Sequence, residues 1–444
     1  MSSCGTTCRK ERKMQTKRIP LVFLAALALS TAALAATPIT LAHPAAGDLV
    51  PARLVTTADL PQLVQPSHDP VQFSWAVPAD RKIAVAPAPH TELSHGYVLR
   101  VTASQLEHGV AIDTVTPGAV IRVNPVRTAA TDDLVAIDPS RLDLQKDGAP
   151  AASGAIQTLA TAEQLSRADM PFPEGSSAFR IDPSLGAGRF TLRAPDLEAA
   201  AGARYVVAVV EPDSPVVLAI RSAVSAAQPG SPFSIEITMR DGDAPLSAAH
   251  ATGVLVAPDG RTQSVALRRA GDHLVANVAI DRTDPAAQGM WELHVSATSR
   301  VGELTARRDG KAAFGLSLPT ARFDGRARLD ASDVAANGLH IGLSVKAAVP
   351  GRYEARGILY GTGDDGALHP MAVGQSAAWL EPGTGTIDLV FKPAIFAGSA
   401  LHAPFEVRDL ELLDQGRMGV LQRQARGLVL DERISSRHGE DTIN

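Results

Sequence analysis

Apolar and polar residues alternate along much of the chain with a period of two. In the segment GMWELHVSAT (289–298), Trp291, Leu293 and Val295 alternate with polar neighbours. The same pattern recurs in FSIEITM (233–239), LVANVAI (274–280) and LHIGLSV (339–345). Such alternation is typical of antiparallel strands with one face on a core and the other in water. It predicts an all-β protein in which Trp291 fills a core.

Turn signals separate these strands. They are Asp241-Gly242, Pro258-Asp259-Gly260, Ala270-Gly271-Asp272, Asp309-Gly310 and Asp365-Gly366. Short strands with glycine and proline between them are typical of sandwiches or barrels. Seven such strands fall within about a hundred residues, which is the size of an immunoglobulin-like sandwich.

We therefore predict tandem immunoglobulin-like β-sandwich domains that follow an irregular, partly helical N-terminal unit. The predicted boundaries are 1–35 for a leader, 36–212 for the N-terminal domain, 213–319 and 320–435 for the sandwiches, and 436–444 for a polar tail. Two short helices are predicted in the N-terminal domain. Each begins with the Thr-x-x-Gln spacing of a capping box, Thr102 with Gln105 and Thr161 with Gln164.

The start of the chain resembles a secretory signal peptide. Counting from Met14, the positive stretch MQTKR precedes the apolar run IPLVFLAALALSTAAL, and Ala33-Leu34-Ala35 forms a small-x-small cleavage site. The alternatives are that translation starts at Met1 and that the run remains as an uncleaved anchor. Cleavage predicts a periplasmic or secreted protein without a membrane span, because no later segment approaches 18 consecutive apolar residues.

Cysteine content and charge exclude some kinds of chemistry and some classes of partner. Both cysteines, Cys4 and Cys8, lie in the leader, so cysteine chemistry and disulfides are excluded from the mature chain. The leader carries six basic residues and one acidic residue, so its removal changes the net charge from −5 to −10. An acidic chain without a block of lysines and arginines is an improbable partner for nucleic acid.

A family resemblance rests on SHGYVLRVTASQLEHGVAIDTVTPGAVIRVNPV (94–126), where an aromatic strand and a short helix ending in HGV precede PGAVIRVNP. This segment resembles the opening module of uncharacterised exported gammaproteobacterial proteins, including those of Legionella and xanthomonads. These proteins carry a domain of unknown function and tandem immunoglobulin-like domains. GRYEARGILYG (351–361) and FEVRDLELLD (405–414) resemble their last sandwich. The resemblance implies a fold for nearly the whole mature chain and no catalytic residue.

Two segments are candidates for metal binding. HTELSH offers His90, Glu92 and His95, of which the first two would share one face of a strand, and a zinc site would need the segment to bend. GTGDDG offers Asp364 and Asp365 to calcium, but it lacks the oxygen spacing of an EF-hand loop. We favour a solvated loop for the first and a hairpin turn for the second, and we predict no cofactor.

The densest positive cluster is formed by Arg307 and Arg308, with Arg300 nearby. It could receive an anionic partner, although arginines in such a position more often flank a hairpin tip in solvent. No nucleophile elbow, H-E-x-x-H motif or phosphate-binding loop is present.

The sequence favours a non-enzymatic exported protein that binds or scaffolds a protein or glycan of the envelope through sandwich loops or edges. Accessory or carbohydrate-binding modules of a secreted hydrolase system are the first alternative, which the low aromatic content of 4% weakens. A metal-dependent hydrolase on the N-terminal domain is the second, and it would use His90, Glu92 and His95.

Overall fold

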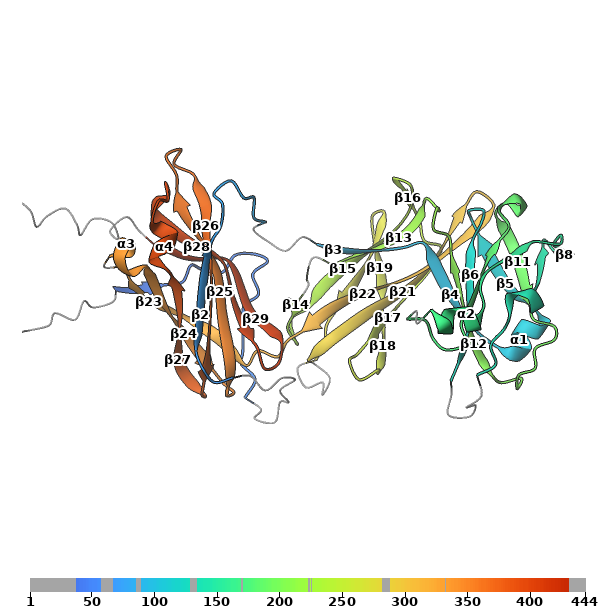
Figure 1. Cartoon of the computed structure of the whole chain (residues 1–444), viewed down its shortest axis with the longest axis horizontal. Coiled ribbons are helices and arrows are strands. Elements are labelled where there is room, and N and C mark those ends of the chain that lie inside the picture. Colours follow the sequence, from blue (N-terminus) through green and yellow to red (C-terminus); the bar gives the residue numbers. More distant parts are fainter. Residues whose placement is uncertain are drawn as a thin grey trace, which may run out of the picture. The chain divides into compact units, whose positions relative to one another are not determined.

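The computed structural model describes residues 37–56, 67–84, 89–127, 134–168, 171–222, 224, 226–281, 288–331 and 333–430. These residues are mostly β-strand, and their predominantly antiparallel sheets pack in pairs around separate hydrophobic cores (Figure 1). The predicted all-β, sandwich-like fold class is confirmed. The immunoglobulin-like topology stays a prediction. The predicted leader and tail lie outside the described residues.

The N-terminal sandwich comprises strands β4 to β12. One sheet has the order β4-β12-β6-β10-β9 (Gly96–Thr102, Arg204–Val210, Val120–Val126, Ser177–Ile181, Ile156–Ala160). The other has the order β5-β11-β7-β8 (Val110–Thr114, Gly188–Arg193, Asp143–Lys146, Ala149–Pro150). Tyr97, Phe179, Phe190 and Tyr205 are among the buried side chains of its core.

Two α-helices and two 3₁₀ turns join these strands. They are α1 (Ala103–His108), α2 (Ala162–Arg167), η1 (Pro139–Arg141) and η2 (Pro183–Leu185). Both predicted capping boxes are present, with Thr102 and Thr161 as the N-caps. None of the helices in the described ranges has the length and apolar character needed to cross a membrane.

The middle sandwich is built from β3 and β13 to β22. One sheet has the order β19-β20-β15-β13-β3 (Leu267–Ala270, His273–Val278, Phe233–Asp241, Val216–Ser222, His90–Ser94), with β16 (Ala244–Leu246) beside β15. The other has the order β14-β22-β21-β17-β18 (Ala226–Ala227, Leu304–Leu316, Gly289–Val301, His250–Val256, Thr262–Val265). Trp291 is only 3% exposed in this core, as its alternation predicts.

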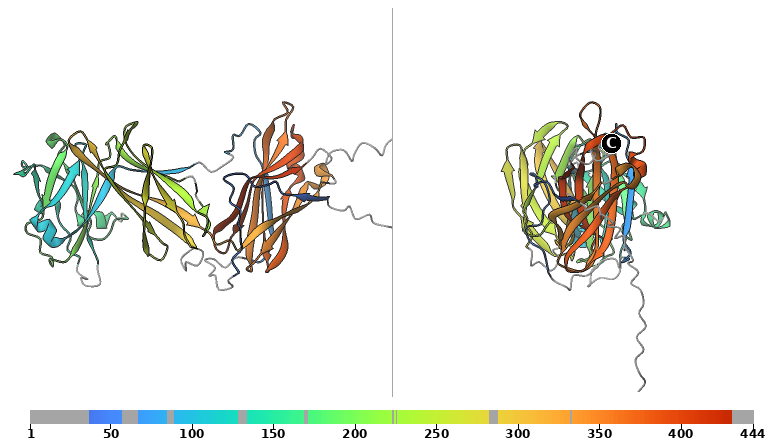
Figure 2. Two further views of the ribbon diagram at one scale, coloured as in Figure 1. Left: turned by 180° about the vertical axis from the view of Figure 1, so that it is seen from behind. Right: turned by 90° about the vertical axis from the view of Figure 1, so that its left-hand side faces the viewer.

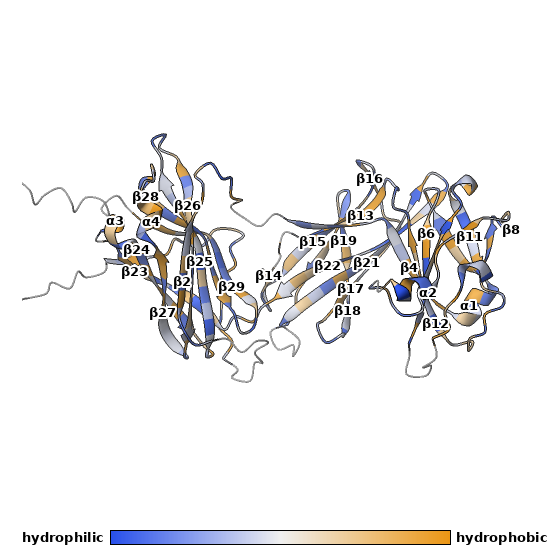
Figure 3. Ribbon diagram, in the orientation of Figure 1, coloured by the Kyte–Doolittle hydropathy of each residue, from blue (hydrophilic) through white to orange (hydrophobic). Residues whose placement is uncertain are grey.

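The hairpin β21–β22 corrects one predicted turn. Apolar and polar residues alternate along most of β21 (Figure 3), and the tip of the hairpin lies at Gly302, whose φ is +59°. Asp309-Gly310 was predicted as a turn, but both residues lie within β22. A Cβ on Gly310 would come within 3.0 Å of Ile220 Cδ1 and 3.3 Å of Leu218 Cδ2. The glycine is thus explained by the close approach of the facing sheet.

The C-terminal sandwich combines β1 and β2 with β23 to β29. One sheet has the order β1-β23-β24-β27 (Thr37–Thr40, Ala321–Asp330, Leu339–Ala347, Gly383–Phe391). The other has the order β2-β26-β25-β28-β29 (Val71–Ala76, Leu368–Leu380, Gly351–Thr362, His402–Asp414, Gly419–Leu430). Two short helices, α3 (Val334–Asn337) and α4 (Pro393–Phe396), complete the domain.

The predicted domain 36–212 does not form one unit, because strands from this range belong to all three sandwiches. Strand β1 pairs with β23, β2 pairs with β26, and β3 pairs with β13. The blue strands β1 and β2 accordingly lie among the orange strands of the C-terminal sandwich (Figures 1 and 2). Each of the three strands takes an edge position in a sheet whose other strands come much later in the sequence.

Candidate functional site

The predicted zinc ligands do not converge. His90 and Glu92 share a face of β3, and His90 Nε2 lies 2.7 Å from Glu92 Oε1 with both side chains about half exposed. His95 follows the strand, and its Nδ1 lies 3.1 Å from the carbonyl oxygen of Ser214. Across the described ranges, no three His, Cys, Asp or Glu side chains gather where they could hold a metal ion. The segment also belongs to the middle sandwich rather than to the N-terminal domain.

The predicted calcium loop is the turn between β25 and β26. Asp365 Oδ1 accepts a hydrogen bond of 2.9 Å from Ala367 N, and its carboxylate lies 3.0 Å from His369 Nε2. The hydrogen bond from Ala367, followed by that from His369, lowers the pKa of Asp365. Asp364 is exposed at the same turn. Asp365 thus stabilises a hairpin, in agreement with the favoured interpretation.

The arginine cluster differs most from its prediction. Arg300 is exposed, but Arg308 is fully buried and forms a 2.7 Å ion pair with Glu211. Arg308 also donates hydrogen bonds of 2.9 Å to the Ser214 hydroxyl and to the Val216 carbonyl. The solvated hairpin tip predicted for this side chain is wrong, because the tip lies six residues earlier, at Gly302.

Buried Glu211 and the partly exposed Arg307 extend this network to the N-terminal sandwich. Glu211 Oε1 accepts hydrogen bonds of 2.7 Å from the backbone of Val115 and Thr116. Arg307 forms a 3.0 Å ion pair with Asp113, a buried residue of β5. These contacts join strand β22 to β5 and to the segment after β12. Arg307 and Arg308 therefore serve structure, whereas Arg300 is exposed.

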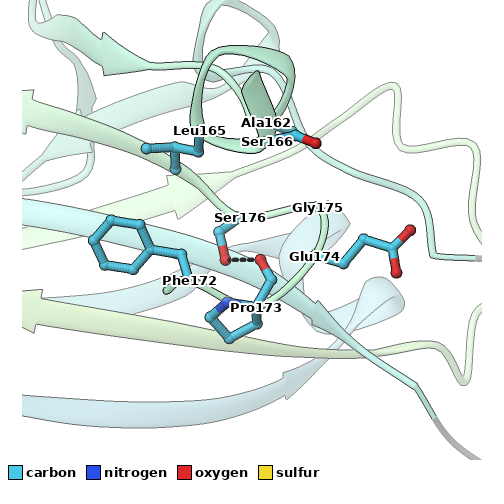
Figure 4. Close-up of a pocket in the computed structure, with 8 residues that line it drawn as sticks. All are labelled: Ala162, Leu165, Ser166, Phe172, Pro173, Glu174, Gly175 and Ser176. Atoms are coloured by element: carbon cyan, nitrogen blue, oxygen red, sulfur yellow. Dashed lines mark hydrogen bonds between the residues drawn. The ribbon is translucent and has the colours of Figure 1, made fainter. Parts of the chain in front are cut away.

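A cavity of about 210 Å³ lies beside α2 (Figure 4). It is smaller than the usual volume of a small-molecule site, roughly 300–1,000 Å³. The Ser176 hydroxyl donates a 2.6 Å hydrogen bond to the Pro173 carbonyl, and Glu174 forms an ion pair with Arg127 (3.1 Å). Its polar groups are thus already engaged with neighbouring residues.

The strongest candidate is the outer surface of the sheet β2-β26-β25-β28-β29. Phe73 and Trp75 on β2 are 53% and 48% exposed. They are paired with Gln375 and Val373 of β26. A Cβ on the intervening Gly374 would touch Phe391 in the core, so Val373 and Gln375, with their partners on β2, face outward.

We call this surface the aromatic face and define it by Phe73, Trp75, Val373, Gln375 and Arg356. One row of paired residues crosses the whole sheet, in the order Phe73, Gln375, Arg356, Glu411 and Arg423. The row begins with an exposed aromatic ring and continues into charged groups.

The charged part of the sheet is a network of ion pairs. Arg356 Nε donates a 3.1 Å hydrogen bond to Glu411, which also lies 3.2 Å from Arg423 Nε. Glu406 pairs with Arg408 (2.8 Å) and Arg426 on the same sheet. Burial alone would raise the pKa of Glu406, but the hydrogen bonds from Arg408 and Arg426 outweigh it and lower the pKa. The carboxylate of Glu406 is therefore held in the ionised state.

This site was not among the sequence-based predictions. The segment VQFSWAV places Phe73 and Trp75 on one side of a strand. Alternation identifies residues that share a face but does not say which face is buried. No other signal in the segment distinguishes the two possibilities.

These features define a multidomain all-β protein with an exposed aromatic and charged sheet face. Comparison with known families assigns the protein to one of them. Residues 62–211 match the N-terminal domain, and residues 320–431 the C-terminal domain, of a domain of unknown function (DUF4785), and the two matches together span more than half of the chain. The chain thus belongs to the DUF4785 family and contains its N-terminal and C-terminal domains. No curated protein matches it.

Solved structures agree with this assignment. The crystal structure of a DUF4785 family protein from Legionella pneumophila matches with a TM-score of 0.66 at 20% identity, over 86% of this chain and 99% of that chain. At this identity the match shows the fold alone. Escherichia coli alpha-2-macroglobulin (TM-score 0.27, 14% identity, 76% of this chain and 20% of that chain) and a marsupial T cell receptor (0.20, 9%, 67% and 99%) match too weakly to carry an argument.

Proposed function

We propose that the protein is a non-enzymatic, exported binding protein that binds a polysaccharide on the aromatic face. The observation that carries the proposal is the pair Phe73 and Trp75, two half-exposed rings two residues apart on one side of β2. Large apolar side chains exposed together mark binding surfaces more often than isolated ones do. Flat rings on a sheet face offer a platform on which sugar rings can stack.

The charged neighbours of the rings favour a sugar over a protein partner. The core of a protein interface is depleted in charged residues and excludes water. Here Arg356 and Glu411 lie in the same row as Phe73, and covering them with an apolar surface would cost desolvation energy. A hydrated ligand rich in hydroxyl groups avoids that cost, because it can exchange hydrogen bonds with Gln375 and Arg356.

The placement of the candidate chemistry supports a non-enzymatic role. His95 contacts Ser214 instead of joining His90 and Glu92, and Arg308 is buried in an ion pair. The hydrolase hypothesis required His90, Glu92 and His95 to bind one metal ion. The low aromatic content does not weigh against sugar binding when two rings lie side by side at the surface.

The double substitution Phe73→Ala/Trp75→Ala tests the proposal. Each ring should contribute roughly 1–2 kcal/mol through the apolar area it buries on binding, so we expect affinity to fall at least about tenfold. Affinity electrophoresis with soluble neutral and acidic polysaccharides measures the change. The matched control Leu159→Ala/Met290→Ala removes two equally exposed apolar side chains elsewhere and should bind like the wild type. Equal retardation of both variants, or no retardation of the wild type, contradicts the proposal and favours a protein partner.

Export is tested separately by sequencing the N-terminus of the protein recovered outside the cytoplasm. Cleavage after Ala35 should give a product that begins at Ala36, one residue before β1. A product that still contains residues 21–29 would show that the leader is retained.

A further inference from the structure

In two ion pairs of the sheet that carries the aromatic face, the cation is more exposed than the anion, whereas in the pair of Arg423 with Asp409 the order is reversed. The side chain of Arg356 is 44% exposed, whereas that of its partner Glu411 is only 11% exposed. Arg426 is 56% exposed above Glu406, which is 7% exposed. A ligand that lies on the aromatic rings therefore meets guanidinium groups before it meets carboxylates.

Arg356 is placed to contact such a ligand. Its Nε and Nη2 donate hydrogen bonds to Glu411, and its Nη1 forms neither of these two bonds. It lies two strands from Phe73 in the same row, a separation of about 10 Å at the usual strand spacing. Glu411 also binds Arg423, so it does not fully neutralise Arg356.

We infer that the polysaccharide is acidic and that Arg356 binds its anionic groups while Phe73 and Trp75 stack on its sugar rings. This inference rests on the proposed function. The guanidinium fork matches the geometry of both carboxylate and phosphate groups, so either can supply the charge. The exposed guanidinium groups of Arg356 and Arg426 offer a polyanion a favourable approach on a mature chain whose predicted net charge is −10.

The test compares polymers that differ only in charge. Polygalacturonate is compared with its methyl ester, and phosphomannan with its dephosphorylated form, by calorimetric titration of the full mature chain. We expect the wild type to bind at least one anionic form about tenfold or more tightly than its neutral counterpart, in line with the strength of hydrogen bonds to charged groups. Added salt should reduce this preference.

The substitution Arg356→Gln should reduce the ratio of the affinities for the charged and the neutral polymer to about one. Affinity for the neutral polymer should fall much less than affinity for the charged one, because the glutamine amide can still donate hydrogen bonds to hydroxyl groups. Arg356→Lys keeps the charge and should retain part of the preference, which provides a second variant if Arg356→Gln folds poorly. Arg300→Gln, at an exposed arginine of the middle sandwich, is the matched control and should behave like the wild type.

The outcomes separate the two proposals. Equal binding of charged and neutral polymers by the wild type, with loss in Phe73→Ala/Trp75→Ala, overturns the acidic ligand and leaves polysaccharide binding in place. A charge preference that survives in Arg356→Gln overturns the role of Arg356. Binding of none of the four polymers overturns both.

Discussion

Replacement of Arg308 by alanine is expected to destabilise the protein by roughly 3–5 kcal/mol, the usual effect of removing one partner of a buried ion pair. The change would leave the carboxylate of Glu211 buried without its cation and would remove hydrogen bonds to Ser214 and Val216. A domain with an ordinary stability of about 5–15 kcal/mol would lose much of its margin. Urea unfolding, with hydrogen exchange to locate the change in β22, measures the effect.

A double-mutant cycle isolates the ion pair itself. Arg308→Met, Glu211→Gln and the combined variant should give a coupling energy of about 1–3 kcal/mol. Arg300→Ala is the matched control, because its side chain is exposed on the same hairpin and should change stability by less than about 0.5 kcal/mol. A loss below about 1 kcal/mol for Arg308→Ala would contradict the burial of this residue.

Trp291→Ala should destabilise the middle sandwich by roughly 3–5 kcal/mol, the usual effect of deleting a large buried aromatic side chain. Trp291 is 3% exposed and belongs to a core separate from those of the other two sandwiches. Increased hydrogen exchange should therefore stay mostly within β13 to β22.

The control for this substitution is Trp75→Ala, which removes the same ring from an exposed position and should change stability little. If Trp291→Ala leaves stability intact, the inward orientation of β21 is contradicted. If the three sandwiches lose protection together, their cores are not independent units.

Many strands of the protein were predictable because they bury a single face. Segments such as FSIEITM and LHIGLSV alternate cleanly, and both form strands, β15 and β24. The capping boxes at Thr102 and Thr161 were predictable for a similar reason, since the stabilising contact is local. Interactions between residues close in the sequence thus account for many of the strands and for the two capped helices.

The assembly of those strands could not be predicted in the same way. β1 and β2 pair with strands some three hundred residues later, and nothing within either segment specifies a partner at that distance. The same limit applies to Arg308 and Gly310, whose environments are set by the facing strand β13 and by Glu211. Both were interpreted as parts of an exposed turn because their own neighbours in sequence are polar.

The candidate site depends on such long-range pairing. Phe73 becomes part of the aromatic face only because β26 and β25 place Gln375 and Arg356 in the same row. The segment 71–76 alone does not contain that information.

Intrinsic tryptophan fluorescence during titration with polygalacturonate tests the central claim most directly, because Trp75 lies on the proposed platform. Stacking of a sugar ring should shift the emission of Trp75 to shorter wavelength and protect it from quenching by iodide. Trp75→Phe should abolish both changes, while Trp291 in the core stays silent. No spectral change in the wild type, or the same change in Trp75→Phe, would contradict binding of the polysaccharide on the aromatic face.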